Sequence, residues 1–253
     1  MYSSFAVVGV GYVGLLIIKA LVQQQASVLV LTCSPPKSDL PEGVTTVRLR
    51  STDIASIARA LQQYHIEVVI STVDADELRF QNSVAEISKG AGVKLFLPSD
   101  FGMPSEGSTP QDSFAAKDKS ARSRSNGKVN LLENIQGETP ISFTSVVDAA
   151  GFVAYILTKL DPARLVYTSF RIEGQRTSIV DIALTLGMSV ERVSEVPSHE
   201  FPLAGSFQEY FETGRGTINW DSAEDKEERE KPGNSNSLWD NHRWKTISEV
   251  LHK

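Results

Sequence analysis

Short apolar runs alternate with amphipathic segments over residues 1–100 of the chain. Apolar runs of strand length, rich in β-branched residues, span Phe5–Val8, Ser27–Leu31, Thr46–Leu49, Val68–Val73 and Lys94–Leu97. Apolar residues recur at helical spacing over Leu15–Gln25, Ile54–Tyr64 and Glu77–Lys89. Strands that alternate with helices form a parallel sheet covered by helices on both faces. The pattern therefore predicts an α/β fold with a doubly wound parallel sheet.

The alternation weakens after Pro98 and returns from Ile141. Residues 104–127 are polar and basic, with one or two helical turns expected at Phe114–Arg124, and residues 221–237 form a charged run typical of a solvated loop. The returning pattern predicts strands at residues 141–146 and 166–172 and helices at Asp148–Leu160, Ser178–Leu186 and Leu238–Leu251. We expect an N-terminal nucleotide-binding domain of residues 1–130 and a smaller C-terminal substrate region of residues 131–253.

A glycine-rich turn connects the first predicted strand to the first predicted helix. Its sequence, VVGVGYVG, places Gly9, Gly11 and Gly14 at the GxGxxG spacing, with Tyr12 and Val13 between the last two glycines. The first glycine allows a tight turn, the second lets the backbone approach a pyrophosphate, and the third lets the helix pack closely on the strand. The alternative is a turn that packs without a ligand. The strand before it and the helix after it favour a Rossmann-type dinucleotide site.

The end of the second predicted strand indicates which dinucleotide is bound. Right-handed crossovers bring the loops at Gly9, Thr32, Thr72 and Pro98 to one crevice. An NAD site usually has an acidic residue after the second strand, to bind the ribose 2′-hydroxyl. This strand instead ends in Leu-Thr-Cys-Ser, with Thr32, Ser34 and Lys37 available to bind a 2′-phosphate. We therefore expect NADP(H), although Lys37 is also open to interpretation as an ordinary surface lysine.

Composition excludes several other classes of protein. The 253 residues are 41% hydrophobic and carry a net charge of −6, which argues against a protein that binds nucleic acid. Cys33 is the single cysteine, so no internal disulfide is expected, and the four histidines lack the spacing of metal ligands. No apolar run reaches the length of a membrane span, and no signal peptide precedes the first strand. We expect a cytoplasmic monomer or homodimer without a metal.

Several motifs together resemble those of a known family. GVGYVG, VVISTV and, above all, AGVKLFLPSDFG at residues 91–102 are similar to motifs of the NmrA-like and isoflavone-reductase-like proteins, which are atypical short-chain dehydrogenases. The segment beginning TPISFTSVVD resembles fungal members. The resemblance implies a Rossmann fold that binds NADPH, with Thr72 and Val73 along the cofactor. It also implies that Pro98, Ser99 and Phe101 lie near the nicotinamide.

The resemblance also implies a catalytic lysine in an FxxK pattern. Phe114-Ala115-Ala116-Lys117 matches that pattern, with Lys119 as the fallback. The implied activity is NADPH-dependent reduction of a small aromatic or carbonyl-bearing substrate. The stretch between this lysine and TPISFTSVVD is much shorter than in the family, so a strand and part of the pocket wall are expected to be missing. The alternative is therefore a redox-sensing NADP(H)-binding protein that acts on a regulatory protein partner without turnover.

A second catalytic arrangement is present in the sequence. Tyr155 and Lys159 have the YxxxK spacing of standard short-chain dehydrogenases, in which the lysine lowers the pKa of the tyrosine, and Ser142 lies upstream. However, the glycine loop is not the TGxxxGxG of that group. Tyr155 also shares a predicted helix face with Phe152, which favours a packing role. We therefore treat the Tyr155–Lys159 pair as a decoy.

Overall fold

The chain folds into two compact units. The computed structural model describes residues 1–33, 39–49, 54–74, 77–102, 127–197, 204–227 and 235–251. Unit 1 comprises Met1–Phe101 and Val146–Ser169, and unit 2 comprises Gly102–Ser145 and Phe170–Lys253. The chain thus returns to unit 1 for one segment after residue 145. This division differs from the single boundary expected at residue 130.

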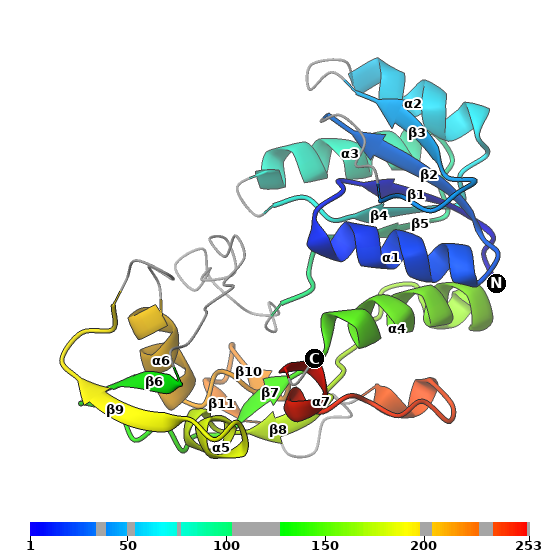
Figure 1. The fold of residues 1–253 in the computed structure, drawn as a ribbon. Coiled ribbons are helices and arrows are strands. Elements are labelled where there is room, and N and C mark those ends of the chain that lie inside the picture. The colour runs from blue at the N-terminus through cyan, green and yellow to red at the C-terminus, as the bar shows by residue number, and fades with distance from the viewer. Residues whose placement is uncertain are drawn as a thin grey trace. The chain divides into compact units, whose positions relative to one another are not determined.

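Unit 1 is built on a five-stranded parallel sheet with the order β3-β2-β1-β4-β5 (Figure 1). The strands are β1 Ser4–Val8, β2 Ser27–Thr32, β3 Thr45–Arg48, β4 Val68–Ser71 and β5 Leu95–Leu97. The two central strands, β1 and β4, are almost completely buried, as expected of parallel strands covered on both faces. The predicted Rossmann-type sheet is confirmed, strand by strand.

Four helices cover the two faces of this sheet. They are α1 Tyr12–Gln23, α2 Ile54–Gln63, α3 Leu78–Gly90 and α4 Val146–Lys159. Helices α2 and α3 lie on one face, and α1 lies on the other with α4 beside it (Figure 1). Eight of the fourteen residues of α4 are buried, among them Phe152, Ile156 and Leu157, which explains why this distant segment joins unit 1.

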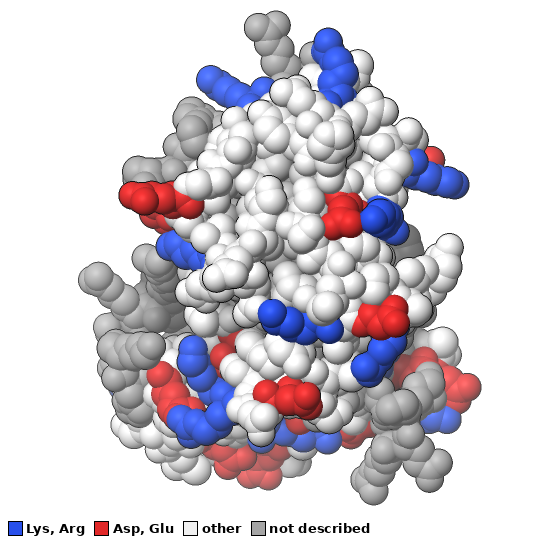
Figure 2. All heavy atoms as spheres, turned by 90° about the vertical axis from the view of Figure 1, so that its right-hand side faces the viewer, with Lys and Arg blue, Asp and Glu red and all other residues white. Residues whose placement is uncertain are grey.

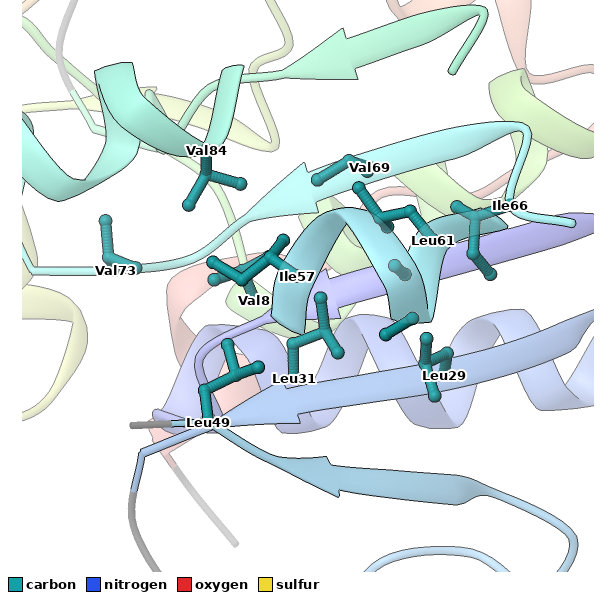
Figure 3. Packing of buried hydrophobic residues seen from close by; sticks show 12 residues of the cluster. Val8, Leu29, Leu31, Leu49, Ile57, Leu61, Ile66, Val69, Val73 and Val84 are labelled. Carbon is teal, nitrogen blue, oxygen red and sulfur yellow. The ribbon is translucent and has the colours of Figure 1, made fainter. Parts of the chain in front are cut away.

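The core between the sheet and α2 is a cluster of aliphatic side chains (Figure 3). Leu29 and Leu31 of β2 and Val69 of β4 point toward α2, whose Ile57 and Leu61 are 2% and 1% exposed. Burying a side chain of this size stabilises a fold by about 1.5–3 kcal/mol. This packing holds the strands in register, and therefore fixes where each strand ends.

The described residues of unit 2 form three small sheets. Strand β6 Lys128–Leu132 pairs in parallel with β9 Ser189–Val193, whereas β7 Ile141–Phe143 pairs antiparallel with β8 Gln175–Thr177, and β10 Trp220–Asp221 with β11 Lys226–Glu227. Its helices are α5 Ile179–Thr185, α6 Ala204–Glu212 and α7 Ile247–Leu251. Ser178 caps α5 by accepting a hydrogen bond from the Asp181 N–H, at the predicted start of that helix.

Two predictions for the C-terminal half are wrong. Residues 166–172 are not a strand, because Tyr167 has a left-handed backbone (φ 54°) and is fully exposed. The closing helix expected over Leu238–Leu251 is reduced to a 3-10 turn at Asn236–Leu238 and the short α7. Asn241 interrupts it with φ 58°, and the rings of Trp239 and His242 stack 3.6 Å apart between the two pieces.

Candidate functional site

The glycine turn lies at the carboxyl edge of the unit 1 sheet. Gly9 follows β1 with φ 94°, a backbone conformation that side chains disfavour. A Cβ at this position would lie 3.0 Å from the carbonyl oxygen of Thr72, which follows β4. The Gly9 N–H donates to the Leu31 carbonyl of β2, at 3.0 Å. The turn is therefore fixed between the two neighbouring strands.

Thr72 joins the glycine turn to β4. Its N–H donates to the Val8 carbonyl at 2.8 Å, and its hydroxyl lies 3.1 Å from that oxygen and 3.0 Å from the Gly9 carbonyl. A Cβ at Gly14 would be 2.5 Å from this hydroxyl and 2.7 Å from the Gly9 carbonyl oxygen. Gly9 and Gly14 therefore have the turning and close-packing geometry that the spacing predicts. Their part in binding stays a prediction.

Gly11 differs from both of these glycines. It is the N-cap of α1, with an ordinary φ of −70°, and a Cβ there would meet nothing within 4 Å. No side chain among the described residues caps the helix, and no acidic residue lies in its first turn. The backbone N–H groups of Tyr12, Val13 and Gly14 precede the first intrahelical bond, from Leu15 to Gly11. A helix start of this kind, with an approachable backbone, suits a pyrophosphate.

The loops after β4 and β5 are also tied together. The Ser99 hydroxyl donates to the Val73 carbonyl at 2.9 Å, and the Ser99 N–H donates to Oε1 of Gln81 at 2.8 Å. Pro98 is exposed, whereas Ser99 and Phe101 are half-buried. Thr72, Val73, Pro98 and Ser99, to which the family resemblance assigns cofactor contacts, thus lie on two adjoining loops at the same edge as the glycine turn.

On the other side of the glycine turn are the ends of β2 and β3. Thr32 is 6% exposed and is the register partner of Arg48, the last residue of β3. The Leu49 N–H donates to the Thr32 carbonyl at 2.9 Å, which fixes the two strand ends side by side. Arg48 is exposed, so its guanidinium adds a positive charge to this end of the edge. The predicted phosphate ligands Ser34 and Lys37 lie outside the described residues.

Comparisons with known proteins agree with this architecture. The NmrA-like family matches residues 2–122. Over this part the chain is similar to the NmrA-like family. No relative was found among curated proteins.

Solved structures extend the likeness to the whole chain. The leucoanthocyanidin reductase–NADPH complex of Vitis vinifera is 15% identical, with a TM-score of 0.73, and the match covers 98% of each chain. An NADPH-dependent quinone oxidoreductase of Escherichia coli, in complex with NADPH, is also 15% identical, with a TM-score of 0.65 and the same coverage. At this identity the likeness shows the fold, an NAD(P)-binding architecture of the Rossmann type.

The lysines to which the NmrA-like resemblance assigns catalysis, Lys117 and Lys119, lie outside the described residues. The stretch expected to be shortened falls partly there too, and its described remainder contains β6. The described residues hold no cluster of metal-ligating side chains. Within the same residues, no helix is both long and apolar enough to cross a membrane.

The decoy pair lies at the opposite edge of the sheet from the glycine turn. Tyr155 and Lys159 flank Leu157 on α4, and the Leu157 carbonyl accepts a hydrogen bond from the Tyr2 N–H, just before β1 begins. Because strands rise about 3.3 Å per residue, Tyr2 is roughly 20 Å from Gly9. This placement counts against a catalytic role for the pair. The Ser142 hydroxyl donates to the Glu173 carboxylate and accepts from the Ile218 N–H at 3.0 Å, both within unit 2.

That opposite edge, where the strands begin, has a different chemistry. Lys94 Nζ contacts Glu67 Oε1 at 2.8 Å, and the Ser3 N–H donates to Glu67 Oε2 at 2.9 Å. The Lys94 hydrogen bond, followed by that of Ser3, lowers the pKa of Glu67 from 4.5 to about 2. These groups line an open hollow of about 740 Å³, together with Ser27 and His65. Figure 2 looks from this side, where charged groups are sparse in the upper half of the view.

Sequence reasoning missed two residues of the carboxyl edge. Gln81 occupies a buried position of α3 with Val84 and Ser88, at the spacing of an apolar helix face. A polar residue in that apolar stripe could have indicated the contact, since a buried amide needs a hydrogen-bond partner. For Arg48 the signal was the third strand itself, because the strand order of a doubly wound sheet places the end of β3 beside the end of β2.

Proposed function

We propose that this protein is an NADPH-dependent reductase of a small aromatic or carbonyl-bearing substrate. The observation that carries the proposal is the glycine turn: Gly9 and Gly14 are closed in by Thr72, while the backbone at Gly11 is open at the start of α1. The NADPH bound by the leucoanthocyanidin reductase and quinone oxidoreductase supports the choice of cofactor.

Each side of the carboxyl edge has its own part in binding. The first N–H groups of α1, with the positive end of the helix dipole, bind the pyrophosphate. The ends of β2 and β3 bind the adenosine half, where Arg48 and Lys37 offer charge to the 2′-phosphate. The loops after β4 and β5 then adjoin the nicotinamide half, because they lie on the other side of the glycine turn.

The proposed chemistry is hydride transfer to the substrate. Bound NADPH supplies the hydride. Lys117 holds the oxygen of the reduced group and donates a proton to it as negative charge develops there. This role comes from the NmrA-like resemblance of the FAAK sequence.

Turnover is tested by following NADPH oxidation with a panel of small aromatic and carbonyl compounds. We expect one or more compounds to be reduced by the wild type, and Lys117→Ala to lower kcat by about 100-fold or more, the scale of general acid catalysis. Lys119→Ala is the matched control and should retain activity. If the two variants exchange these outcomes, Lys119 has the role. NADPH binding without any turnover would contradict the reductase and support the redox-sensing protein.

The choice of cofactor is tested by separate titrations with NADPH and NADH at fixed ionic strength. We expect tighter binding of NADPH. Lys37→Ala and Arg48→Gln should each weaken NADPH binding by roughly 1 to 3 kcal/mol, the range for a hydrogen bond to a charged group. Both variants should leave NADH binding nearly unchanged. Lys89→Gln, in the last turn of α3, removes the same charge away from the glycine turn and is the control. Equal affinity for both dinucleotides in the wild type would contradict the assignment.

A further inference from the structure

A buried glutamine on α3 reaches the loop that follows β5. Gln81 is 8% exposed, and its Oε1 accepts the Ser99 N–H at 2.8 Å. Burial of an apolar side chain in this position would cost less free energy, since a buried amide must be compensated by hydrogen bonds. The hydrogen-bond partner of Gln81 is the backbone of a loop. Ser88, in the same buried stripe, instead donates to the Val84 carbonyl of its own helix at 2.7 Å.

The contact of Gln81 with Ser99 ends a chain of hydrogen bonds along the carboxyl edge. Thr72 bonds to the Gly9 turn, and the adjacent Val73 carbonyl accepts the Ser99 hydroxyl. Ser99 is thus held twice, by its hydroxyl to the β4 loop and by its N–H to α3. The Asp100 N–H donates to the Pro98 carbonyl at 2.9 Å, so the loop also forms a tight turn of its own.

We propose that Gln81 is a positioning residue, which holds the Pro98–Asp100 loop in the conformation that would receive the nicotinamide half of a dinucleotide. The inference rests on the proposed function, because it presumes that a dinucleotide crosses this edge. The strand order indicates which half of the dinucleotide this loop would meet. Strands β2 and β3 lie on the adenosine side of the glycine turn, and β4 and β5 lie on the nicotinamide side. Gln81 would therefore act through Ser99, on the nicotinamide half and not on the adenosine half.

Two ligands separate this role from a general effect on folding. Adenosine 2′,5′-bisphosphate contains the adenosine half alone, whereas NADPH spans the edge. Gln81→Met preserves side-chain length but removes the acceptor for the Ser99 N–H. We expect Gln81→Met to weaken NADPH by about three- to tenfold, the equivalent of one hydrogen bond, and to leave binding of the bisphosphate unchanged. Both dissociation constants are measured by calorimetry on the full chain.

Two further variants keep the test decisive. Gln81→Glu retains an oxygen that accepts the Ser99 N–H, so we expect it to restore the wild-type ratio of the two dissociation constants. Ser88→Ala removes a buried hydrogen bond of the same helix without touching the loop, and should leave the ratio unchanged. If Gln81→Met leaves the ratio of the two dissociation constants unchanged, even when both ligands bind more weakly, the inference is overturned and the proposed function stands. If the wild type binds neither ligand, the proposed function falls and the inference with it.

Discussion

The two edges of the unit 1 sheet are made by the same strands but differ in where their polar groups find partners. At the amino edge, Glu67 is paired with Lys94 and Ser3. At the carboxyl edge, the side-chain bonds of Thr72 and Ser99 hold backbone turns in place, and the helix start at Gly11 has no side-chain cap. At the amino edge the polar side chains pair with one another, whereas at the carboxyl edge they hold the turns beside an uncapped helix start, where we propose that the dinucleotide binds. Substitutions at the two edges should therefore have different effects.

The largest effect is expected from Gly14→Ala. The new Cβ would lie 2.5 Å from the Thr72 hydroxyl and 2.7 Å from the Gly9 carbonyl oxygen, which is backbone and cannot move aside cheaply. We expect a loss of about 1–3 kcal/mol in the free energy of unfolding, typical of overpacking, together with loss of NADPH binding. Urea unfolding and an NADPH titration measure the two. Wild-type stability would show that the close contact between α1 and β4 is not as described.

An intermediate effect is expected from Thr72→Val. The substitution keeps the shape of the side chain but removes the hydroxyl that bonds to the Val8 and Gly9 carbonyls. We expect a loss of about 0.5–1.5 kcal/mol in the free energy of unfolding and several-fold weaker NADPH binding, because the glycine turn is held less firmly. Thr72→Ser, which retains the hydroxyl, is the control. Equal NADPH affinity in the valine and serine variants would contradict this role.

The smallest effect is expected at the amino edge, from Glu67→Gln. Because folding lowers the pKa of Glu67 to about 2, its contribution to stability is complete above about pH 4.5 and disappears as the pH falls toward 2. The side chain of Lys94 is 61% exposed, so this contribution should be below about 1 kcal/mol. We expect Glu67→Gln to flatten this acid dependence of thermal unfolding without changing NADPH affinity. Glu86→Gln, at an exposed position of α3, is the control, and the same flattening there would refute the assignment.

The sequence predicted the carboxyl edge much better than it predicted unit 2. Strands β1, β2 and β4 each contain a continuous apolar run and the glycine spacing is distinctive, so local pattern sufficed to place them. The strands of unit 2 carry weaker signals. Lys128–Leu132 and Ser189–Val193 lie far apart in the chain and pair only through tertiary contacts, so neither was predicted.

The errors have specific physical causes. The run at residues 166–172 has the β-branched and aromatic composition of a strand, but the left-handed Tyr167 and the absence of a pairing partner among the described residues outweigh that propensity. The predicted helix over Leu238–Leu251 has a suitable apolar spacing, yet the stacking of Trp239 on His242 replaces the middle turns. Gln81 was missed because its hydrogen-bond partner is the backbone N–H of Ser99, which helical periodicity does not reveal.

The central claim, that the backbone at Gly11 receives a dinucleotide, is tested most directly by one pair of variants. A Cβ at Gly11 or at Gly90, the last residue of α3, meets nothing within 4 Å, and neither glycine has a positive φ. Both alanine variants should therefore fold with stabilities within about 1 kcal/mol of the wild type. In an NADPH titration, we predict that Gly11→Ala weakens binding by about tenfold or more, about 1.4 kcal/mol, and that Gly90→Ala binds like the wild type. Equal NADPH affinity in the two variants, or no binding by the wild type, would contradict the account.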